Sequence, residues 1–596
     1  MADYSAPLAD MRFALNEIVH LPELAKLPDC EQAAPDLVDQ VLEEAAKLAG
    51  EVIAPLNVVG DREHSRLENG VVRTPTGFAA AYRQYVEGGW NSLPFDPAHG
   101  GQGLPQVVSI AVLEMWTSAN LGFALCPLLN IGAVELLQAH GSPEQKRIYL
   151  EKMISGEWTG TMNLTEPQAG SDVGALRTRA VKDGDRYRIT GQKIFITYGE
   201  HDMAPNIVHM VLARLPEAPP GTRGISLFIV PKFLPKTDGS PGERNDLRAV
   251  SLEHKLGIHA SPTCVMAYGD NGGAIGYLVG EENRGMEYMF TMMNAARLGV
   301  GLQGHAIAER AYQQAREYAR QRVQGKPLGA PANGALPIIH HGDVRRMLLE
   351  MRALTEGARA LTYYTAAAID RAHHHPDAAE RARQQKLVDL LIPVVKAWGT
   401  DIGVEVASIG VQVHGGMGYI EETGAAQHMR DARIAPIYEG TNGIQAIDLV
   451  GRKLGRDGAA AAREFIGGMR KADAELAAAP GDDLAAIRRH LASGIDALAT
   501  ATEGIAKTLA GDAPRALAGA VPYLTLFGTV TAGWLLAQGA AAAQRALGAK
   551  TGDAKFLRAK IAIARFYADH RLAGAPARLS ATAGGATVMG FDPEWL

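Results

Sequence analysis

Three short segments carry residue types whose chemistry can be combined in one site. Residues 437–442 read Ile-Tyr-Glu-Gly-Thr-Asn and place the carboxylate of Glu439 between an apolar run, residues 434–438, and a glycine. Burial in an apolar setting raises the pKa of a carboxyl group, and such a carboxylate can remove a weakly acidic proton. Glu439 is therefore the candidate general base.

The other two segments are rich in hydroxyls, amides and glycines. Residues 162–172 read Met-Asn-Leu-Thr-Glu-Pro-Gln-Ala-Gly-Ser-Asp. Residues 412–421 read Gln-Val-His-Gly-Gly-Met-Gly-Tyr-Ile-Glu and are followed by Met-Arg-Asp-Ala-Arg at 429–433. Each segment alone is moderate evidence, so their order and the elements that carry them decide the interpretation.

The first of those elements are helices. Residues from about 36 to 158 read as helical, with Val38, Val41, Leu42, Ala45 and Leu48 at the i, i+3, i+4 spacing of one helix face. Ser-Pro-Glu-Gln at 142–145 is a capping box with proline at the first helical position, and it predicts a helix that runs to about Ile154.

The pattern changes to short β-type runs between about 159 and 283. The clearest runs, at 186–190, 193–197, 207–213 and 225–230, predict a small antiparallel sheet or barrel.

Helical patterns return at about residue 286. Gly304, Ala308, Ala311, Ala315 and Ala319 place small residues on one face of a long helix, which permits close helix packing. Gly-Arg-Asp-Gly at 455–458 looks like a linker, followed by an alanine-rich helical extension to about 570 and a loose tail. The predicted divisions are an N-terminal extension (1–36), a helical domain (37–158), a β domain (159–283), a helical bundle (284–455) and a C-terminal helical extension (456–596).

In this order and in this α–β–α context, the three motifs closely resemble those of the acyl-CoA dehydrogenase family, from about residue 37 to 452. The resemblance implies an α+β, mostly α fold with a central β-barrel-like domain, and FAD bound between that domain and the C-terminal bundle. It implies an acyl-CoA substrate, oxidation to the 2,3-enoyl-CoA, and Glu439 as the base whose own N–H helps bind the thioester oxygen. Some relatives carry the base on the long helix, but the matching residue here is Ala296, which cannot serve.

The chemistry of such a reaction agrees with the motifs. The α-proton of a thioester is weakly acidic, so a base must meet it where the enolate oxygen is stabilised. The β-hydrogen must leave as hydride, which a flavin accepts and protein side chains do not.

The resemblance also assigns the remaining site residues. Those expected to contact the flavin within the first motif and the following strand are Met162, Leu164, Thr165, Gly170, Ser171, Phe195 and Thr197. Phe195 stands where many members have tryptophan, so the flat ring is kept but the indole N–H is lost. Further flavin contacts are expected from Arg322, Gln412, Gly415, Gly416 and Thr441. Glycines 415 and 416 let main-chain N–H groups approach a phosphate because no Cβ intervenes.

Arg322 and the Gln412 loop match groups that one subunit lends to its partner's flavin, so a homodimer or larger assembly is expected. Contacts to the substrate are expected from Ser171, Arg297, Tyr438 and Gly440. The resemblance further suggests an electron-transferring flavoprotein as the acceptor of electrons.

Composition supports an ordinary globular protein. The chain has 596 residues, a net charge of −6 and three dispersed cysteines, which favour neither nucleic-acid binding nor a disulfide framework nor a structural zinc site. No signal peptide is evident, and a reducing, cytoplasmic compartment is expected. Residues 516–544 carry no charge, yet they contain Pro522, glycines, several threonines and much alanine, so a helix buried in a bundle is preferred over a membrane span.

Two further patterns are interpreted as decoys. Gly299-Val-Gly-Leu-Gln-Gly304 matches a dinucleotide fingerprint but follows a helical pattern rather than a strand. His373-His-His375 could ligate a metal, but Pro376-Asp377 follows it and an exposed loop between helices is preferred. No metal site is therefore predicted.

The length of the C-terminal extension, with the opening residues 7–17, resembles a long bacterial subgroup of the family. Its substrates include 3-methylmercaptopropionyl-CoA, which is slightly favoured here, and medium- to long-chain acyl-CoA. Two rival functions stay open at this point: an acyl-CoA oxidase that uses oxygen, and a non-catalytic acyl-CoA-binding relative.

Overall fold

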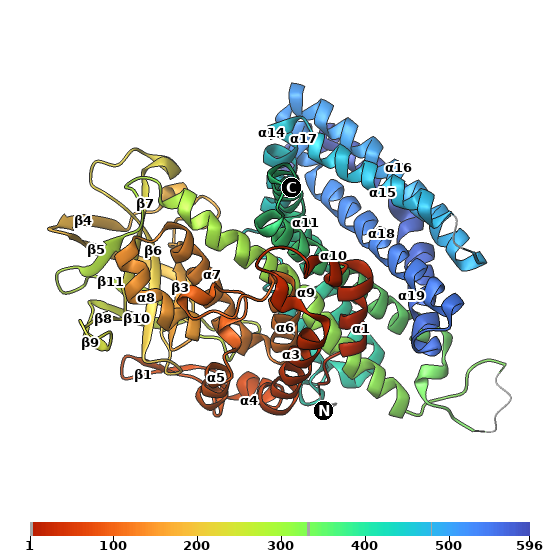
Figure 1. Cartoon of the computed structure of the whole chain (residues 1–596), viewed down its shortest axis with the longest axis horizontal. Helices are drawn as coiled ribbons and strands as arrows, with labels where there is room; N and C mark the ends of the chain where they lie inside the picture. Colours follow the sequence, from red (N-terminus) through yellow and green to blue (C-terminus); the bar gives the residue numbers. More distant parts are fainter. Residues whose placement is uncertain (1–3, 330–333, 478–479, 596) are drawn as a thin grey trace. The chain divides into compact units, whose positions relative to one another are not determined.

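The computed structural model describes residues 4–329, 334–477 and 480–595; the first three residues of the predicted N-terminal extension and Leu596 lie outside them. The chain forms two compact units (Figure 1). The sheet unit comprises Glu44–Leu104 and Met115–Gly299, and the helical unit comprises Met1–Glu43, Pro105–Glu114 and Val300–Leu596. Helices α3 (Pro35–Lys47), α6 (Gln106–Ala119) and α9 (Gly285–Gln321) contribute residues to both units.

The sheet unit is built around an eight-stranded sheet. Its strands are β3 (Trp158–Asn163), β4 (Arg179–Asp183), β5 (Arg186–Thr197), β6 (Asn206–Arg214), β7 (Ile225–Pro231), β10 (Leu247–Leu252), β11 (Thr263–Tyr268) and β12 (Ala274–Leu278). The order is β10-β11-β5-β12-β7-β6-β3, and β4 pairs with both β5 and β6. Strands β5, β12, β7, β6 and β4 therefore close a ring, which is the predicted barrel-like arrangement.

Two details of the sheet differ from the prediction. Strand β3 pairs parallel with β6, with Trp158 opposite Asn206, so the sheet is mixed rather than antiparallel. The parallel pair arises because the chain leaves β3, builds the β4–β5 hairpin and returns in its original direction. The runs 186–190 and 193–197 are one strand, β5, which pairs with β4 and β12 before Gly191 and with β11 from Gly191 onward.

Helices and two small hairpins complete the sheet unit. The helices are α4 (Leu56–Glu63), α5 (Phe78–Glu87), α7 (Leu121–His140) and α8 (Pro143–Ser155). The hairpins pair β1 (Arg66–Glu68) with β2 (Val71–Arg73) and β8 (Phe233–Pro235) with β9 (Pro241–Arg244). The β1–β2 hairpin was not predicted, although its Asn69-Gly70 turn, with φ of 51° and 79°, is the usual two-residue hairpin turn.

The predicted capping box of α8 is confirmed. Ser142 Oγ accepts a hydrogen bond from Gln145 N (3.2 Å), and Gln145 Oε1 accepts one from Ser142 N (3.0 Å). Helix α7 packs closely on β3, since a Cβ on Gly160 would lie 2.4 Å from the Cβ of Ala133. This packing fixes the strand whose end leads into residues 164–172.

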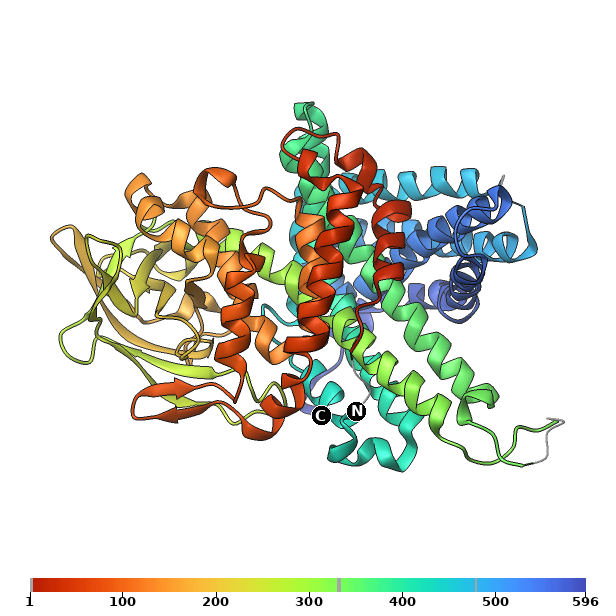
Figure 2. The same ribbon diagram turned by 60° about the horizontal axis from the view of Figure 1, so that its bottom comes forward.

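The helical unit is a bundle of long helices, drawn from green to blue in Figures 1 and 2. Its principal helices are α10 (Gly342–His374), α11 (Ala378–His414), α12 (Ala425–Ala432), α13 (Asn442–Ile447), α15 (Ala460–Leu476), α16 (Asp482–Gly511), α18 (Ala520–Ala549) and α19 (Ala554–His570). Shorter ones are α1 (Leu8–Phe13), α2 (Leu21–Leu24), α14 (Gly455–Asp457), α17 (Ala513–Ala518), α20 (Arg578–Ala583) and α21 (Gly585–Met589). A π-helical turn, η11 (Asp448–Leu454), leads directly into α14.

Two expectations for this region are wrong in detail. The predicted linker 455–458 is a helical turn that ends where Gly458 and Ala459 adopt left-handed φ values of 61° and 69°. The predicted loose tail folds into η12 (Leu572–Ala577), α20 and α21, which pack on α16 and α17. Small residues that are uninformative in sequence allow this close packing: a Cβ on Gly585 would lie 2.0 Å from the carbonyl oxygen of Arg515.

The small-residue face of α9 packs as expected. Ala308, Ala315 and Ala319 are fully buried, and a Cβ on Gly304 would lie 1.9 Å from the carbonyl oxygen of Gly399 in α11. Only glycine at residue 304 allows the two backbones this approach.

Two helices among the described residues, α7 and α18, are long and apolar enough to cross a membrane by length and composition alone. Their most apolar windows are 89% and 83% buried within the protein. Helix α18, which carries most of the charge-free segment, packs against α10, α11, α16 and α19. The prediction of a helix buried in a bundle is thus confirmed.

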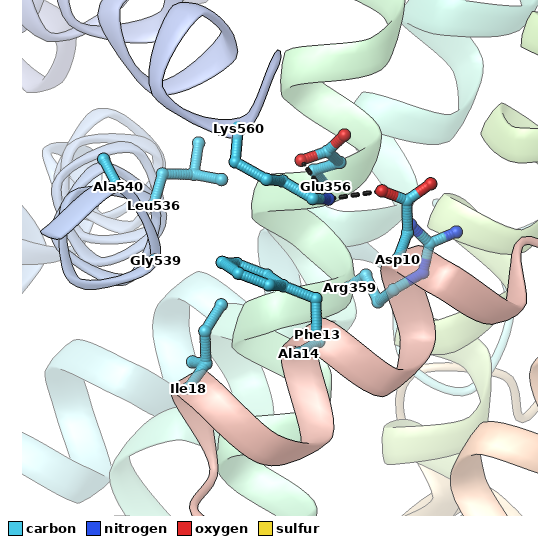
Figure 3. Close-up of a pocket in the computed structure, with 10 residues that line it drawn as sticks. All are labelled: Asp10, Phe13, Ala14, Ile18, Glu356, Arg359, Leu536, Gly539, Ala540 and Lys560. Carbon is cyan, nitrogen blue, oxygen red and sulfur yellow. Dashed lines mark hydrogen bonds and ion pairs between the residues drawn. The ribbon is translucent and has the colours of Figure 1, made fainter. Parts of the chain in front are cut away.

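Within the helical unit, α1 is joined to α10 and α19 through a buried charge cluster (Figure 3). Lys560 Nζ lies between Asp10 and Glu356, with a 3.0 Å bond to the latter. The ammonium group also lies over the ring of Phe13, 5.2 Å from its centroid. The surrounding cavity of about 20 Å³ holds at most one water molecule, so it is part of the packing rather than a ligand site.

Candidate active site

The first candidate segment leaves β3 as a loop, residues 164–172, which we call the Thr165 loop. It is tied to β5 through its main chain: Leu164 O accepts a bond from Lys193 Nζ (2.9 Å), and Thr165 O accepts one from Ile194 N (2.9 Å). Glu166 and Ala169 bond to one another across the loop through N–H and C=O groups. The structure therefore gives the loop one defined path beside β5.

A buried ion pair anchors this loop. Lys193 is fully buried and Glu166 is 3% exposed, and their Nζ and Oε1 atoms lie 2.8 Å apart. Glu166 also accepts bonds from Arg177 N (2.6 Å) and from N and Oγ1 of Thr178 (3.0 and 2.6 Å). These bonds tie the loop to β5 and to residues 177 and 178, which precede β4.

Burial and pairing act in opposite directions on these two groups. Burial alone raises the pKa of Glu166, but the charge of Lys193 and the hydrogen bonds lower it to about 2. Burial lowers the pKa of Lys193 to about 8, because the attraction of Glu166 only partly offsets the loss of water. The carboxylate is thus ionised over the whole physiological range.

The end of β5 presents the remaining predicted residues of the sheet unit. Phe195 is 58% exposed and has a left-handed φ of 60°, which turns a large aromatic ring outward. Thr197 is partly buried and its carbonyl accepts a bond from Thr161 Oγ1 (2.7 Å). Gly170 and Ser171, at the end of the Thr165 loop, are exposed. A flat apolar ring and several hydroxyls are therefore presented by adjacent segments.

In the helical unit, residues 434–441 connect α12 to α13 and are called the Glu439 loop. Glu439 is partly buried and has a left-handed φ of 56°, and Gly440 follows with φ 81°. The hydroxyl of Tyr438 donates to Gln303 Oε1 of α9. Burial and the charge of Glu439 raise the pKa of Tyr438 well above its usual value, so it stays a hydrogen-bond donor.

Hydrogen bonds from neighbouring polar groups fix the main chain of the Glu439 loop. Lys396 Nζ donates to Gly440 O (2.8 Å), and Gln445 Nε2 donates to Glu439 O (3.1 Å). Thr441 Oγ1 caps α13 by accepting a bond from Ile444 N (3.2 Å). The backbone that presents Glu439 is thus held at three consecutive residues.

The glycine-rich segment lies at the other end of α11. Gln412 is exposed in the last turn, Gly415 ends the helix with φ 60°, and a Cβ at either Gly415 or Gly416 would meet no atom within 4 Å. Arg322 is exposed just beyond the end of α9. Gln412 follows Lys396 by sixteen residues of continuous helix, roughly 24 Å along the axis at about 1.5 Å per residue. The structure therefore separates the Gln412 group from the Glu439 loop within the helical unit.

Other predicted residues and decoys have clear positions. Arg297 is 6% exposed in α9 with its guanidinium 6.0 Å from the ring centroid of Phe290, and Ala296 beside it is buried. The motif at 299–304 lies wholly inside α9. His373 and His374 belong to the last turn of α10 rather than to a loop. Across the described ranges, no three His, Cys, Asp or Glu side chains gather as a metal site.

A cavity of about 160 Å³ in the sheet unit lies elsewhere. It is lined among others by His64, His254, His259 and Ser261, and by none of the predicted site residues. His259 contacts the Asp61 carboxylate (2.9 Å), and its ring centroid lies 4.2 Å from that of His64, with the two rings tilted by 37°.

Sequence reasoning missed the residues that hold the two loops. Lys193, Lys396 and Gln445 are buried supports rather than groups that resemble a ligand site. One signal was present for Lys396, a lone lysine within the apolar run 390–398. A charge in such a run needs a buried partner, but the sequence does not identify that partner.

Family models match almost the whole chain. They are described as the N-terminal domain (residues 38–157), middle domain (161–270) and C-terminal domain (283–454) of acyl-CoA dehydrogenase, and as acetyl-CoA dehydrogenase C-terminal like (461–592).

Curated relatives and solved structures are similar over most of their length. The chain is 52% identical over 570 residues to a 3-methylmercaptopropionyl-CoA dehydrogenase of Ruegeria pomeroyi, covering 96% of each chain. It is 36% identical over 597 residues to a broad-specificity linear acyl-CoA dehydrogenase of Mycobacterium tuberculosis, again covering 96% of each. A Bacillus anthracis acyl-CoA dehydrogenase complexed with FAD has the same fold, with a TM-score of 0.74 at 21% identity over 98% of this chain and 92% of that one. The predicted fold class is confirmed.

Proposed function

Because this chain belongs to the acyl-CoA dehydrogenase family, it is an FAD-dependent enzyme that dehydrogenates an acyl-CoA thioester, and we propose that Glu439 is its base and 3-methylmercaptopropionyl-CoA its substrate. The similar proteins are named dehydrogenases, so the oxidase alternative is not favoured. The identity of 52% across the full length of the Ruegeria protein supports the substrate. A medium- or long-chain acyl-CoA is the second candidate, because the 36% identical Mycobacterium protein is named for broad specificity.

The Glu439 loop supports the role of the base. Glu439 is partly buried, follows the apolar run 434–438, and has a left-handed backbone conformation that a residue other than glycine keeps only where its surroundings determine it. The alternative position, Ala296, carries a methyl group and cannot accept a proton. In the proposed reaction the carboxylate of Glu439 takes the α-proton, and the negative charge that develops on the thioester oxygen is met by its main-chain N–H.

The sheet unit fits a flavin chemically. An isoalloxazine is flat, apolar on its faces and polar at its edge, and the exposed ring of Phe195 lies in sequence between the loop with Thr165 and Ser171 and the strand end at Thr197. We propose that these hydroxyls and the main chain of Met162, Leu164 and Gly170 hold that edge. When bound, the flavin supplies the acceptor for the β-hydride.

The proposed assembly is a homodimer or larger. Arg322, Gln412, Gly415 and Gly416 are all exposed, and the Gln412 group lies roughly 24 Å along α11 from the support of the Glu439 loop. This separation supports the proposal that these four residues contact the flavin of a second subunit. Thr441 is proposed to contact the flavin near Glu439. We also propose the domain division given above, a cytoplasmic location and an electron-transferring flavoprotein as acceptor.

The observation that carries the proposal is the partly buried, left-handed position of Glu439. Substitution of Glu439 tests the proposal. Glu439→Gln keeps the volume and the main-chain N–H but removes the base, so FAD and acyl-CoA stay bound while flavin reduction falls by about 10²–10⁴-fold or more. The assay is anaerobic mixing with saturating 3-methylmercaptopropionyl-CoA, followed by bleaching of the flavin band. Glu464→Gln, at an exposed site on α15, is the matched control.

Bleaching of Glu439→Gln within a few-fold of the control contradicts the assignment of the base. A panel of thioesters from short to long, with and without the thioether sulfur, tests the substrate. Faster reduction by a long straight-chain acyl-CoA than by the thioether contradicts that part of the proposal.

A further inference from the structure

A buried lysine lies directly beneath the backbone of the proposed base. Lys396 is fully buried in α11, three residues after Pro393, within an otherwise apolar stretch. Its Nζ donates to Gly440 O (2.8 Å) and to Asn442 Oδ1 (2.9 Å). The ammonium group therefore bonds the residue after Glu439 and the first residue of α13.

Asn442 extends this contact into a clamp on α11. Its Nδ2 donates to Ala397 O (3.0 Å) and to Asp401 Oδ1 (2.7 Å), and it lies 3.0 Å from Thr400 Oγ1. The side-chain amide of Asn442 therefore bonds the start of α13 to one turn of α11. Because Asn442 directly follows the Glu439 loop, the C-terminal end of the loop is fixed to α11.

Gln445, within α13, bonds the same part of the Glu439 loop. Its Nε2 donates to the carbonyl oxygens of Glu439 (3.1 Å) and Gly440 (3.3 Å), and the residue is fully buried. The carbonyl groups of both residues thus point at buried donors. Fixing these carbonyls fixes the peptide planes on both sides of Gly440.

The conformation that is held needs such support. Glu439 and Gly440 are consecutive left-handed residues, with φ of 56° and 81°. For a residue other than glycine this conformation costs about 1–2 kcal/mol and persists only when the surrounding structure determines it. The buried bonds to Lys396 and Gln445 are the local groups that determine it here.

The charge of Lys396 matters as well as its geometry. An ammonium group taken out of water is costly, and a neutral donor would satisfy the same oxygen atoms at lower cost. Burial raises the pKa of nearby Asp401, while the bond from Asn442 and the charge of Lys396 act to lower it, so this cation influences its neighbourhood. A buried cation under the loop also favours any negative charge that the loop carries or meets.

We propose that Lys396 is a positioning residue for the dehydrogenation. It holds the main chain at Glu439 and Gly440 in the conformation that aims the carboxylate and the Glu439 N–H at the thioester, and its charge favours the anionic forms of base and substrate. This role rests on the proposed function of Glu439.

The test compares Lys396→Met with Lys560→Met, a matched substitution of another buried lysine in the helical unit, whose ammonium group bonds Asp10 and Glu356 rather than the Glu439 loop. Both holoenzymes are assayed for FAD content, for thioester affinity and for the anaerobic rate of flavin bleaching. We expect Lys396→Met to retain FAD and to bind the thioester within about threefold of Lys560→Met. Its bleaching rate falls about 10–100-fold, since small misplacements of reacting groups have effects of this size.

A second measurement separates positioning from a merely structural role. A 3-thia-acyl-CoA has sulfur in place of the β-carbon, so it can lose the α-proton but no β-hydride. Its anion beside the flavin gives a long-wavelength absorption, which is titrated against pH. In Lys396→Met the absorption develops at a pH about one unit higher than in Lys560→Met, because removal of a nearby cation disfavours the anion.

Each outcome decides one claim. If Lys396→Met bleaches within twofold of Lys560→Met and titrates at the same pH, the role of Lys396 is wrong while a slow Glu439→Gln still supports the proposed function. If Glu439→Gln bleaches at the wild-type rate, the assignment of Glu439 as the base fails. If Lys396→Met does not fold, Gln445→Leu takes its place. A bleaching rate at least about fivefold below wild type supports the claim that buried donors position the Glu439 loop. A bleaching rate within twofold of wild type overturns that claim.

Discussion

Lys193→Met should loosen the Thr165 loop and weaken FAD binding. The substitution leaves Glu166, which is 3% exposed, without the cation 2.8 Å away. Removing one partner of a buried ion pair costs about 3–5 kcal/mol. Glu166 keeps bonds from Arg177 N and from N and Oγ1 of Thr178, so we expect the lower end, about 3 kcal/mol.

The pKa shifts of the two partners act in opposite directions on stability. Burial lowers the pKa of Lys193 from 10.5 to about 8, which costs stability near pH 7. The pKa of Glu166 is lowered from 4.5 to about 2, which adds stability to the folded protein. Because the folded pKa lies below the unfolded value, this stability is present above pH 4.5 and is lost as the pH falls from about 4.5 to about 2. The free energy of unfolding of wild type should therefore fall on acidification through this window, and Lys193→Met should show a weaker dependence there.

The assay follows FAD fluorescence as the cofactor is released in urea at pH 7. Lys182→Met, the control, removes an exposed lysine from β4 in the same sheet. It should change the free energy of unfolding by less than about 0.5 kcal/mol and leave the urea midpoint nearly unchanged. The double variant Lys193→Met/Glu166→Gln carries no buried charge and should recover at least about 1 kcal/mol of the loss. If the urea midpoint and the FAD dissociation constant of Lys193→Met match those of Lys182→Met, the ion pair does not hold the loop.

Three further predictions address other parts of the structure. Gly304→Ala forces a Cβ to within 1.9 Å of Gly399 O, so it should lower the free energy of unfolding by about 3 kcal/mol and with it the thermal midpoint. Gly548→Ala, in open space on α18, should leave the thermal midpoint unchanged or raise it. Equal midpoints of the two variants would contradict the close helix packing. Phe195→Ala should weaken FAD binding about tenfold with little change in unfolding, because the ring is 58% exposed, and Phe195→Trp should restore affinity in a fluorescence titration. Arg322→Ala should lower FAD occupancy without changing Glu439-dependent chemistry in the FAD-loaded fraction; unchanged occupancy in a dialysis assay would remove Arg322 from the cofactor site.

Local patterns in the sequence predicted much of the fold. The capping box at Ser142 and the small-residue face of α9 were recognised because both depend on residues three or four positions apart on one helix. The three motifs located the Thr165 loop, the end of α11 and the Glu439 loop because each is contiguous in the chain. The β1–β2 hairpin was also readable from Asn69-Gly70 but was missed within a region that looked helical throughout.

The sequence could not show which distant segments meet. The parallel pairing of β3 with β6 depends on how the intervening hairpin turns back, which no local pattern encodes. The small residues that let the C-terminal tail pack on α17 have no periodicity to reveal them.

The sequence by itself determined which residues are candidates for chemistry, because residue type and short spacing are properties of the chain. Only the tertiary structure decided how those residues are held. Lys193 meets Glu166 across 27 positions and Lys396 meets Gly440 across 44. In a linear sequence each lysine is simply a charge in an apolar or mixed run. Its partner is chosen by the burial that brings two distant segments together, because a charge removed from water must bond whatever acceptors the fold places beside it.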